Sequence, residues 1–264
     1  MTDRTHSDGR GYEFVGGYPT AETAQRAHDE AGFNRAVQAY RFFYPSVSIM
    51  ATWKGNMRAG TVANKVFALL EGTPQQYVFT PNSDTPYSGL PLDLTDGPMV
   101  LDLPPGPLMS TANDLNQRWI IDMGLPGPDK GEGGRHVILP PGYDGEVPAG
   151  YYTGRSTTNR LLVLLRALPR GKDMAGAIEL MKSVKVYRLG EEPVAPDWVD
   201  LTMLADEDFT PVPWEDNLKS GRSWLSCSTT SPRSRSSVRT TAICPSWASL
   251  ATSRSSRTSG CGTS

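Results

Sequence analysis

Short apolar runs separated by proline and glycine fill the middle of this chain, and they constrain its fold more than any other feature. Runs of this kind between turn-forming residues are typical of strands in a β-rich region. Residues 161–165 are apolar at every position, which favours a strand buried on both faces. We predict strands at residues 77–80, 87–93, 99–103, 118–123, 136–139, 151–154 and 161–167.

The residues before this region predict helices. Thr20 is a good N-cap, and Glu22 lies in the first turn, where the helix dipole favours an acid. The predicted helix covers residues 20–44, and we expect Pro45 to stop or kink it because proline has no N–H to donate. Further helices are predicted at residues 46–58, 63–70 and 173–183, with a last strand at 184–189. The fold class is therefore α+β: N-terminal helices followed by a β-sandwich or partly closed antiparallel β-barrel.

Composition divides the chain into three parts. We predict a disordered segment at residues 1–18, a domain of helices plus β-sandwich at residues 19–219, and a Ser/Arg-rich tail at residues 220–264. The first two parts hold all 28 acidic residues and 20 of the 26 basic ones, which is a net charge of −8. This charge argues against a nucleic-acid or anionic-membrane surface.

The tail contains 15 Ser, 7 Thr and 6 Arg, and it begins abruptly after Lys219. A natural disordered, phosphorylatable extension has such a composition, but scattered tryptophan and cysteine count against it. When GC-rich codons are regrouped by one base, residues 245–264 can read ELGIARDKPFEPDERMRDV, and residues 224–232 can read AELLDDEP. These acidic peptides resemble the rest of the chain. We therefore interpret the tail as a frameshifted, disordered segment.

No secretory signal is recognised, and the apolar runs are too short to span a bilayer, so the sequence predicts a cytoplasmic protein without membrane contact. All three cysteines lie in the tail, which leaves residues 1–219 without a thiolate ligand or cysteine nucleophile. His6, His28 and His136 are far apart in sequence. Neither a metal nor another cofactor is predicted.

The densest polar motif covers residues 80–89. Asn82 can cap a turn, and the purely structural interpretation is a rigid Asx turn that leads into a strand. The functional interpretation is a preorganised loop in which Asn82 and Thr85 bind a ligand while Asp84 and Tyr87 are catalytic. In an enzyme, Asp84 would be the acid or base.

Two more polar loops precede predicted strands. Asn116 and Arg118 lie in the first, where the arginine could hold an anion bidentately or simply pair with an acid. Arg155 and Asn159 lie in the second, whose side chains could bind a ligand or only satisfy backbone groups of the loop. All three loops could converge at one end of a sandwich, where binding sites are usually built.

Asn82-Ser-Asp-Thr-Pro-Tyr-Ser88, followed by Leu92-Asp-Leu94 and Gly97-Pro-Met-Val100, resembles the hallmark of the bacterial domain of unknown function 1254. Further segments that carry the resemblance are residues 20–26, 35–40, 116–119, 142–147 and 155–159. It covers roughly residues 18–219. It implies a second β-rich domain, the domain of unknown function 1214, which this product would lack. Relatives tend to read Leu-Gly-Ile-x-x-x-Lys-Pro-Phe where the shifted frame reads LGIARDKPF.

The family brings no established activity. From the polar loops we predict a ligand-binding or enzymatic β-sandwich module that acts on a small polar or carbohydrate-like molecule. The alternatives are a non-catalytic structural or interaction module and a truncated product without function. The sequence leaves the ligand, the reaction and the oligomeric state open.

Overall fold

The computed structural model describes residues 5–7, 9, 11–72 and 82–202, and it divides into two compact units between Phe43 and Tyr44. The first unit holds a small antiparallel sheet where the sequence predicted disorder. Its strands are β1 (Thr5–Ser7), β2 (Glu13–Val15) and β3 (Tyr18–Pro19). The Thr20 hydroxyl accepts the Thr23 N–H at 3.2 Å, as expected of a residue that caps the helix α1 (Ala21–Arg58).

Helix α1 continues through Pro45, so the predicted end at this residue and the separate second helix are wrong. A proline removes one helical hydrogen bond, and at this position residues 116 and 117 form hydrogen bonds with the helix. Gln117 donates to the Pro45 carbonyl at 2.9 Å, and the Ser46 hydroxyl donates to Asn116 Oδ1 at 2.9 Å. Both contacts lie within the second unit, beside the proline that interrupts the helical hydrogen bonds.

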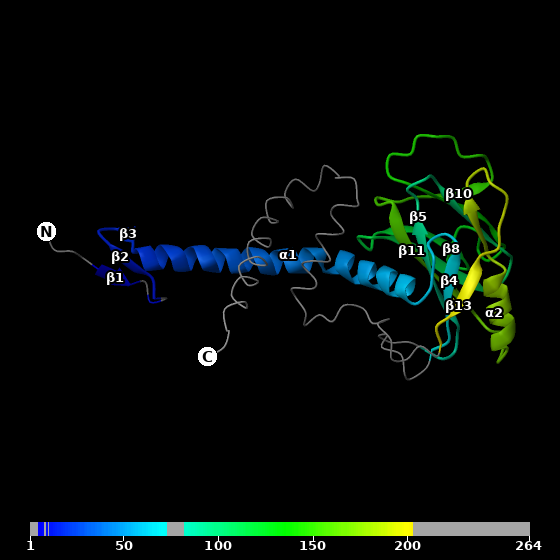
Figure 1. Ribbon diagram of the computed structural model, residues 1–264, viewed down its shortest axis with the longest axis horizontal. Coiled ribbons are helices and arrows are strands. Elements are labelled where there is room, and N and C mark those ends of the chain that lie inside the picture. The colour runs from blue at the N-terminus through cyan, green and yellow to red at the C-terminus, as the bar shows by residue number, and fades with distance from the viewer. Residues whose placement is uncertain (1–4, 8, 10, 73–81, 203–264) are drawn as a thin grey trace, which may run out of the picture. The chain divides into compact units, whose positions relative to one another are not determined.

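The second unit is built on two sheets (Figure 1). The larger contains, in spatial order, β13 (Asp197–Asp200), β4 (Val66–Leu70), β5 (Tyr87–Asp93), β11 (Arg160–Ala167), β7 (Leu108–Asp114) and β8 (Trp119–Gly124). The smaller contains β10 (Tyr151–Arg155), β9 (Gly134–Leu139), β6 (Met99–Leu103) and β12 (Lys185–Arg188). All neighbours are antiparallel except β13 with β4 and β10 with β9.

One hydrophobic core joins the inner faces of the two sheets. Leu90 and Val163 pair across the larger sheet, and Leu101 of the smaller sheet belongs to the same buried cluster. Alternate residues of each strand supply this core, as expected when one face of each sheet is covered by the other. The α+β class with a β-sandwich is thereby confirmed, and the sheets form no closed barrel.

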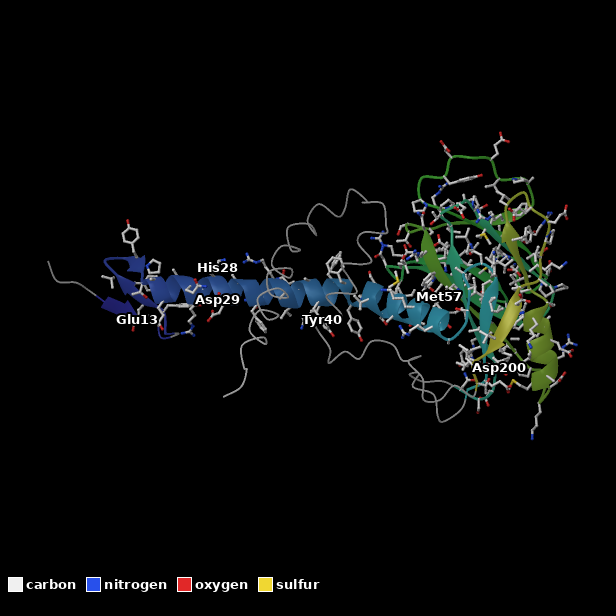
Figure 2. All side chains as sticks on the ribbon, in the orientation of Figure 1. Glu13, His28, Asp29, Tyr40, Met57 and Asp200 are labelled. Carbon is white, nitrogen blue, oxygen red and sulfur yellow. The ribbon has the colours of Figure 1, made fainter. Side chains whose placement is uncertain are left out.

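Each outer face has its own covering. The C-terminal part of α1 packs Met50 and Trp53 against Leu162 of β11, with Met57, labelled in Figure 2, beside them. The smaller sheet carries a second apolar cluster in which Val137 and Tyr187 pack against Tyr143 and Val147 of the loop after β9. Leu164 is an exception, because it is 48% exposed although the whole run was expected to be buried.

Several predicted elements are confirmed with shifts of one or two residues. Strands β5 and β6 have the expected bounds, and β8, β9, β10, β11 and β12 differ slightly at their ends. Helix α2 (Met174–Lys182) begins after Asp173, whose side chain accepts the Gly176 N–H at 2.9 Å. The predicted strand at residues 77–80 lies outside the described residues.

Three strands of the second unit were not predicted correctly. Residues 63–70 were expected to be helical, but β4 places Phe67 and Leu69 in the core and pairs with β5, so burial overrides helix propensity. Strand β7 alternates buried and half-exposed positions, but small polar residues such as Ser110 hide the pattern. Strand β13 was missed because an acid stands at each end, although Trp198 packs on the core.

Candidate functional site

The loop before β5 is an Asx turn, as the purely structural interpretation of the motif predicts. Asn82 Oδ1 accepts the N–H groups of Asp84 and Thr85 at 3.0 and 3.2 Å, while its amide donates to the Tyr87 hydroxyl at 2.7 Å. Asn82 therefore holds the loop together, and the Asp84 side chain is exposed. This arrangement does not test whether Asp84 or Tyr87 acts on a ligand.

Arg166 completes this cluster, and the sequence did not single it out. Its Nε and Nη2 donate to the Thr85 hydroxyl at 3.1 and 2.8 Å, and its guanidinium lies 4.6 Å from the centre of the Tyr87 ring. Register explains the contact, since Arg166 and Tyr87 are direct partners on β11 and β5. The available signal was a lone arginine at the end of an apolar strand.

The loop of Asn116 and Arg118 turns around the buried carboxylate of Asp114, which sequence reasoning also missed. Asp114 Oδ1 accepts the backbone N–H groups of Asn116 and Arg118 at 2.8 and 2.9 Å. Its Oδ2 accepts the hydroxyl of Thr157 from the next polar loop. The Arg118 side chain is exposed, and Asn116 binds Ser46 of α1.

The loop of Arg155 and Asn159 meets the Asp114 loop, because the Leu115 N–H also donates to Thr158 Oγ1 at 3.1 Å. Arg155 points elsewhere and donates to the carbonyl of Tyr143 at 2.7 Å. Asn159 is half-buried, and its carbonyl accepts the Leu94 N–H at 2.8 Å. Two of the three polar loops therefore converge, as the sequence suggested.

The loop of Asn82 and Asp84 lies at the opposite end of the larger sheet, so the expected convergence of all three loops is wrong. Strand β11 pairs Arg166 with Tyr87 at one end and Arg160 with Asp93 at the other. At about 3.3 Å per residue, these ends are ~20 Å apart. Asn159 adjoins the second end, so it cannot share one small-molecule site with Asp84. The physical reason is that β5 and β11 are antiparallel, so the loops that precede them lie at opposite ends of these strands.

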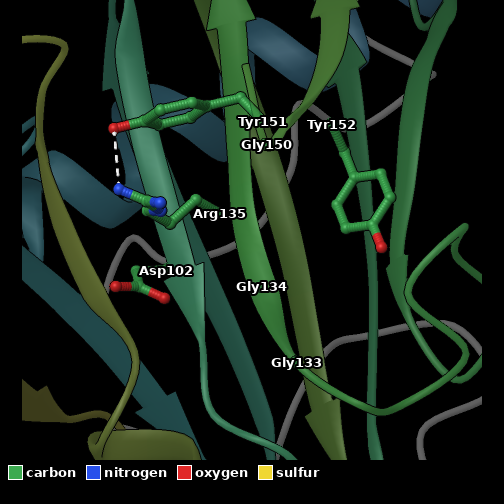
Figure 3. Close-up of a pocket in the computed structure, with 7 residues that line it drawn as sticks. All are labelled: Asp102, Gly133, Gly134, Arg135, Gly150, Tyr151 and Tyr152. Carbon is green, nitrogen blue, oxygen red and sulfur yellow. Dashed lines mark hydrogen bonds between the residues drawn. The ribbon is translucent and has the colours of Figure 1, made fainter. Parts of the chain in front are cut away.

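A hollow of about 460 Å³ lies instead on the smaller sheet (Figure 3). Its lining residues are Asp102, Gly133, Gly134, Arg135, Gly150, Tyr151 and Tyr152. They come from β6, from the turn into β9 and from the start of β10. None of the sequence-predicted site residues lines it.

Sheet register aligns the polar side chains of this hollow. Arg135 of β9 is the direct partner of Asp102 on β6 and of Tyr151 on β10. The Arg135 guanidinium lies 4.7 Å from the centre of the Tyr151 ring, and Nη1 reaches the Tyr151 hydroxyl at 3.4 Å. Figure 3 shows Asp102 beneath Arg135 on the same face. A carboxylate, a guanidinium and a phenol thus stand in one row, with donors and acceptors side by side.

Tyr187 of β12 borders the same face and is buried. Burial, the nearby negative charge of Asp102 and a hydrogen bond with Tyr151 together raise its pKa from 10.0 to about 12, and burial is the largest of these causes. The phenol therefore stays protonated at every physiological pH. It supplies a fixed donor behind Tyr151.

Glycines shape the rim of the hollow. Gly133 has a φ of 79°, and a Cβ there would lie 2.6 Å from the Leu103 carbonyl oxygen. At Gly134 a Cβ would lie 3.1 Å from the Tyr152 ring. At Gly133 the backbone of its neighbours leaves no room for a side chain, and at Gly134 the φ of 148° favours glycine. The Gly-rich run Gly131-Glu-Gly-Gly134 is the sequence signal that could have indicated the hollow.

Two general findings concern the described residues. No group of three or more His, Cys, Asp or Glu is placed there to hold a metal ion. Within the same residues, no helix combines the length and the apolar character needed to cross a membrane.

The fold and the hollow define a β-sandwich module with a polar recess on its smaller sheet. Residues 64–188 match the family described as "Protein of unknown function (DUF1254)". The match spans every strand that forms the hollow. The family expectation drawn from the motif around Asn82 is thereby confirmed.

Two solved structures are similar to the chain. The VPA0106 protein from Vibrio parahaemolyticus has 15% identity and a TM-score of 0.49, over 84% of this chain and 58% of that one. A protein from Burkholderia cenocepacia has 12% identity and a TM-score of 0.32, over 75% of this chain and 54% of that one. This chain therefore spans little more than half the length of either. None of the curated proteins matches it.

Proposed function

We propose that this module binds a small polar, carbohydrate-like molecule in the hollow on its smaller sheet. The observation that carries the proposal is the row of Asp102, Arg135 and Tyr151 along one wall of a recess of about 460 Å³. This volume lies in the range of small-molecule sites.

The chemistry of the row suits neighbouring hydroxyl groups. The Asp102 carboxylate accepts hydrogen bonds, Arg135 donates several, and the phenols do both. Tyr152 follows Tyr151 in β10, so its side chain points to the other face of the sheet, as Figure 3 shows. Because one acid faces one base, a neutral or weakly charged molecule fits better than a strongly charged one.

The test is a titration of the ¹⁵N-labelled full chain with D-glucose, in which NMR records the amide signals at each step. We expect the amide signals of Gly133, Gly134 and Gly150 to move together in a saturable way. Asp102→Asn should weaken binding roughly ten-fold, the effect of losing about 1.4 kcal/mol from a charged hydrogen bond. Asp197→Asn is a matched control, because Asp197 is exposed on an edge strand of the other sheet.

The same titration, carried out on the Asp84→Asn variant, tests the enzymatic hypothesis built on Asp84. Asp84→Asn should leave the glucose-induced shifts unchanged if the hollow is the site. A saturable response around residues 82–88 that Asp84→Asn abolishes, with none at the three glycines, would move the site to the Asx-turn loop. A chain that responds to D-glucose nowhere would favour the non-catalytic structural module.

A further inference from the structure

Strand β11 carries two arginines on the same face, and only one of them is paired with an acid. Arg160, at the start of the strand, donates to Asp93 Oδ2 at 3.2 Å and lies 5.1 Å from the centre of the Trp53 ring. Arg166, near the end, lies over Tyr87 in the same manner but forms no ion pair with an acid of the described residues. Its guanidinium is half-buried, so an external anion would supply a counter-charge that the described chain does not.

Thr85 fixes the orientation of the Arg166 guanidinium. Nε and Nη2 of Arg166 both donate to the Thr85 hydroxyl, which in turn donates to Asn82 Oδ1 at 3.3 Å. These bonds occupy one edge of the planar group, and no described residue accepts a hydrogen bond from Nη1. The edge formed by Nη1 and the second hydrogen of Nη2 therefore keeps its donors for a ligand. A carboxylate binds such an edge bidentately.

Apolar side chains flank Arg166 on the outer face of the larger sheet. Arg166 is the direct partner of Met109 on β7, and Leu164 lies on the same face of β11, two residues earlier. Helix α1 packs on this face at Leu162, whereas Leu164 is 48% exposed. A large exposed apolar side chain beside an unpaired cation favours a ligand that has both an apolar body and a negative charge.

Acids on the same face lie too far from Arg166 to replace a ligand. Asp122 of β8 pairs with Thr111 of β7, which is the residue opposite Leu164. Strand β8 is separated from β11 by β7, and two strand spacings amount to about 10 Å. Asp84, in the loop before β5, is exposed and forms no ion pair with Arg166. Arg166 is therefore a single cation, and a single negative charge balances it.

We propose that Arg166, Thr85 and Leu164 form a binding site for a small monocarboxylate with an apolar body. The guanidinium holds the carboxylate bidentately, Thr85 keeps the guanidinium in place, and Leu164 contacts the apolar body. A carboxylate fits better than a phosphate, because a phosphate carries more charge and more acceptor oxygens than one arginine can satisfy. The site is independent of the hollow, which lies on the smaller sheet.

The test uses sodium benzoate as the probe and benzamide as its neutral counterpart. NMR of the ¹⁵N-labelled full chain records the amide signals of Thr85, Leu164 and Arg166 during each titration. We expect saturable shifts with benzoate and roughly ten-fold weaker binding of benzamide, because a hydrogen bond to a charged acceptor is the stronger one. Equal affinities for the two probes, or no benzoate response at these three residues, would overturn the proposal.

Substitutions of Arg166 separate its charge from its shape. Arg166→Gln should weaken benzoate binding roughly ten-fold, and Arg166→Lys roughly five-fold, because lysine keeps the charge but cannot bind bidentately. Arg118→Gln is the matched control and should stay within roughly two-fold of the wild type, since the Arg118 side chain is exposed in another loop. Wild-type affinity in Arg166→Gln would contradict the site. If Arg166→Gln does not fold, wild-type affinity in Arg166→Lys would contradict the bidentate contact.

The role of Leu164 is tested with a second, smaller carboxylate. Leu164→Ala should weaken benzoate binding roughly four-fold, the effect of losing about 0.8 kcal/mol of apolar contact. Acetate has almost no apolar body, so its affinity should change by less than about two-fold. A similar loss for both carboxylates, or no loss for benzoate, would contradict the contact between Leu164 and the ligand.

Discussion

Tyr187 is the residue whose environment departs most clearly from that of an exposed side chain of its type. It is buried beside Asp102, and its pKa is raised to about 12. An unfolded chain ionises the phenol near pH 10, but the folded chain resists this until about pH 12. The stabilisation is therefore fully present below pH 10 and is lost as the pH rises through the folded-state value.

We predict that Tyr187→Phe reduces the alkaline loss of stability. In the wild type, the free energy of unfolding should fall by on the order of 1 kcal/mol between pH 9 and pH 11, since one pKa unit corresponds to about 1.4 kcal/mol. Urea denaturation at pH 9, 10 and 11 measures this. Tyr18, which is 78% exposed, offers the control variant Tyr18→Phe. Equal slopes for all three proteins would rule out the raised pKa of Tyr187.

At the level of single residues, the sequence predicted local chemistry better than location. The ability of Asn82 to cap a turn is encoded within three residues, and the structure confirms it. By contrast, Asp102 and Tyr151 are ordinary residues in the sequence. They become neighbours of Arg135 only through strand register. No local pattern could have identified them.

At the level of elements, Asp114 joins two loops that are distant in sequence. It lies at the end of β7, is completely buried, and accepts hydrogen bonds from both loops. Its carboxylate compensates backbone N–H groups that would otherwise be buried without partners. The loops that carry Arg118 and Asn159 depend on this one side chain for their positions.

Asp114→Ala should therefore lower the free energy of unfolding by about 3 kcal/mol, because several buried groups lose their partner at once. Asp114→Asn should cost about 1 kcal/mol, since an amide oxygen can still accept the two N–H groups. Chemical denaturation of the full chain measures both. The exposed Asp144 provides the control Asp144→Ala, and a similar small effect in all variants would show that the loops hold without this link.

At the level of the whole molecule, the abrupt change of composition at Ser220 stays a prediction, because residues 203–264 lie outside the described residues. We expect the source DNA to carry one or two missing or extra bases between the codons for Lys219 and Trp224. Sequencing this stretch decides the matter. An intact frame would make the Ser/Arg-rich tail a genuine part of the protein, and its role would then need explanation.

The sequence by itself determined most strands of the sandwich, the N-cap of helix α1 and the resemblance to the family. These follow from local periodicity, turn residues and motif order, all of which act over a few neighbouring residues. Tertiary structure alone decided that helix α1 continues through Pro45, that residues 66–70 form a strand, and that the polar loops separate. It also decided that the recess lies beside Arg135. The reason is physical: strand pairing joins residues that are far apart in sequence, and burial against such partners outweighs local propensity.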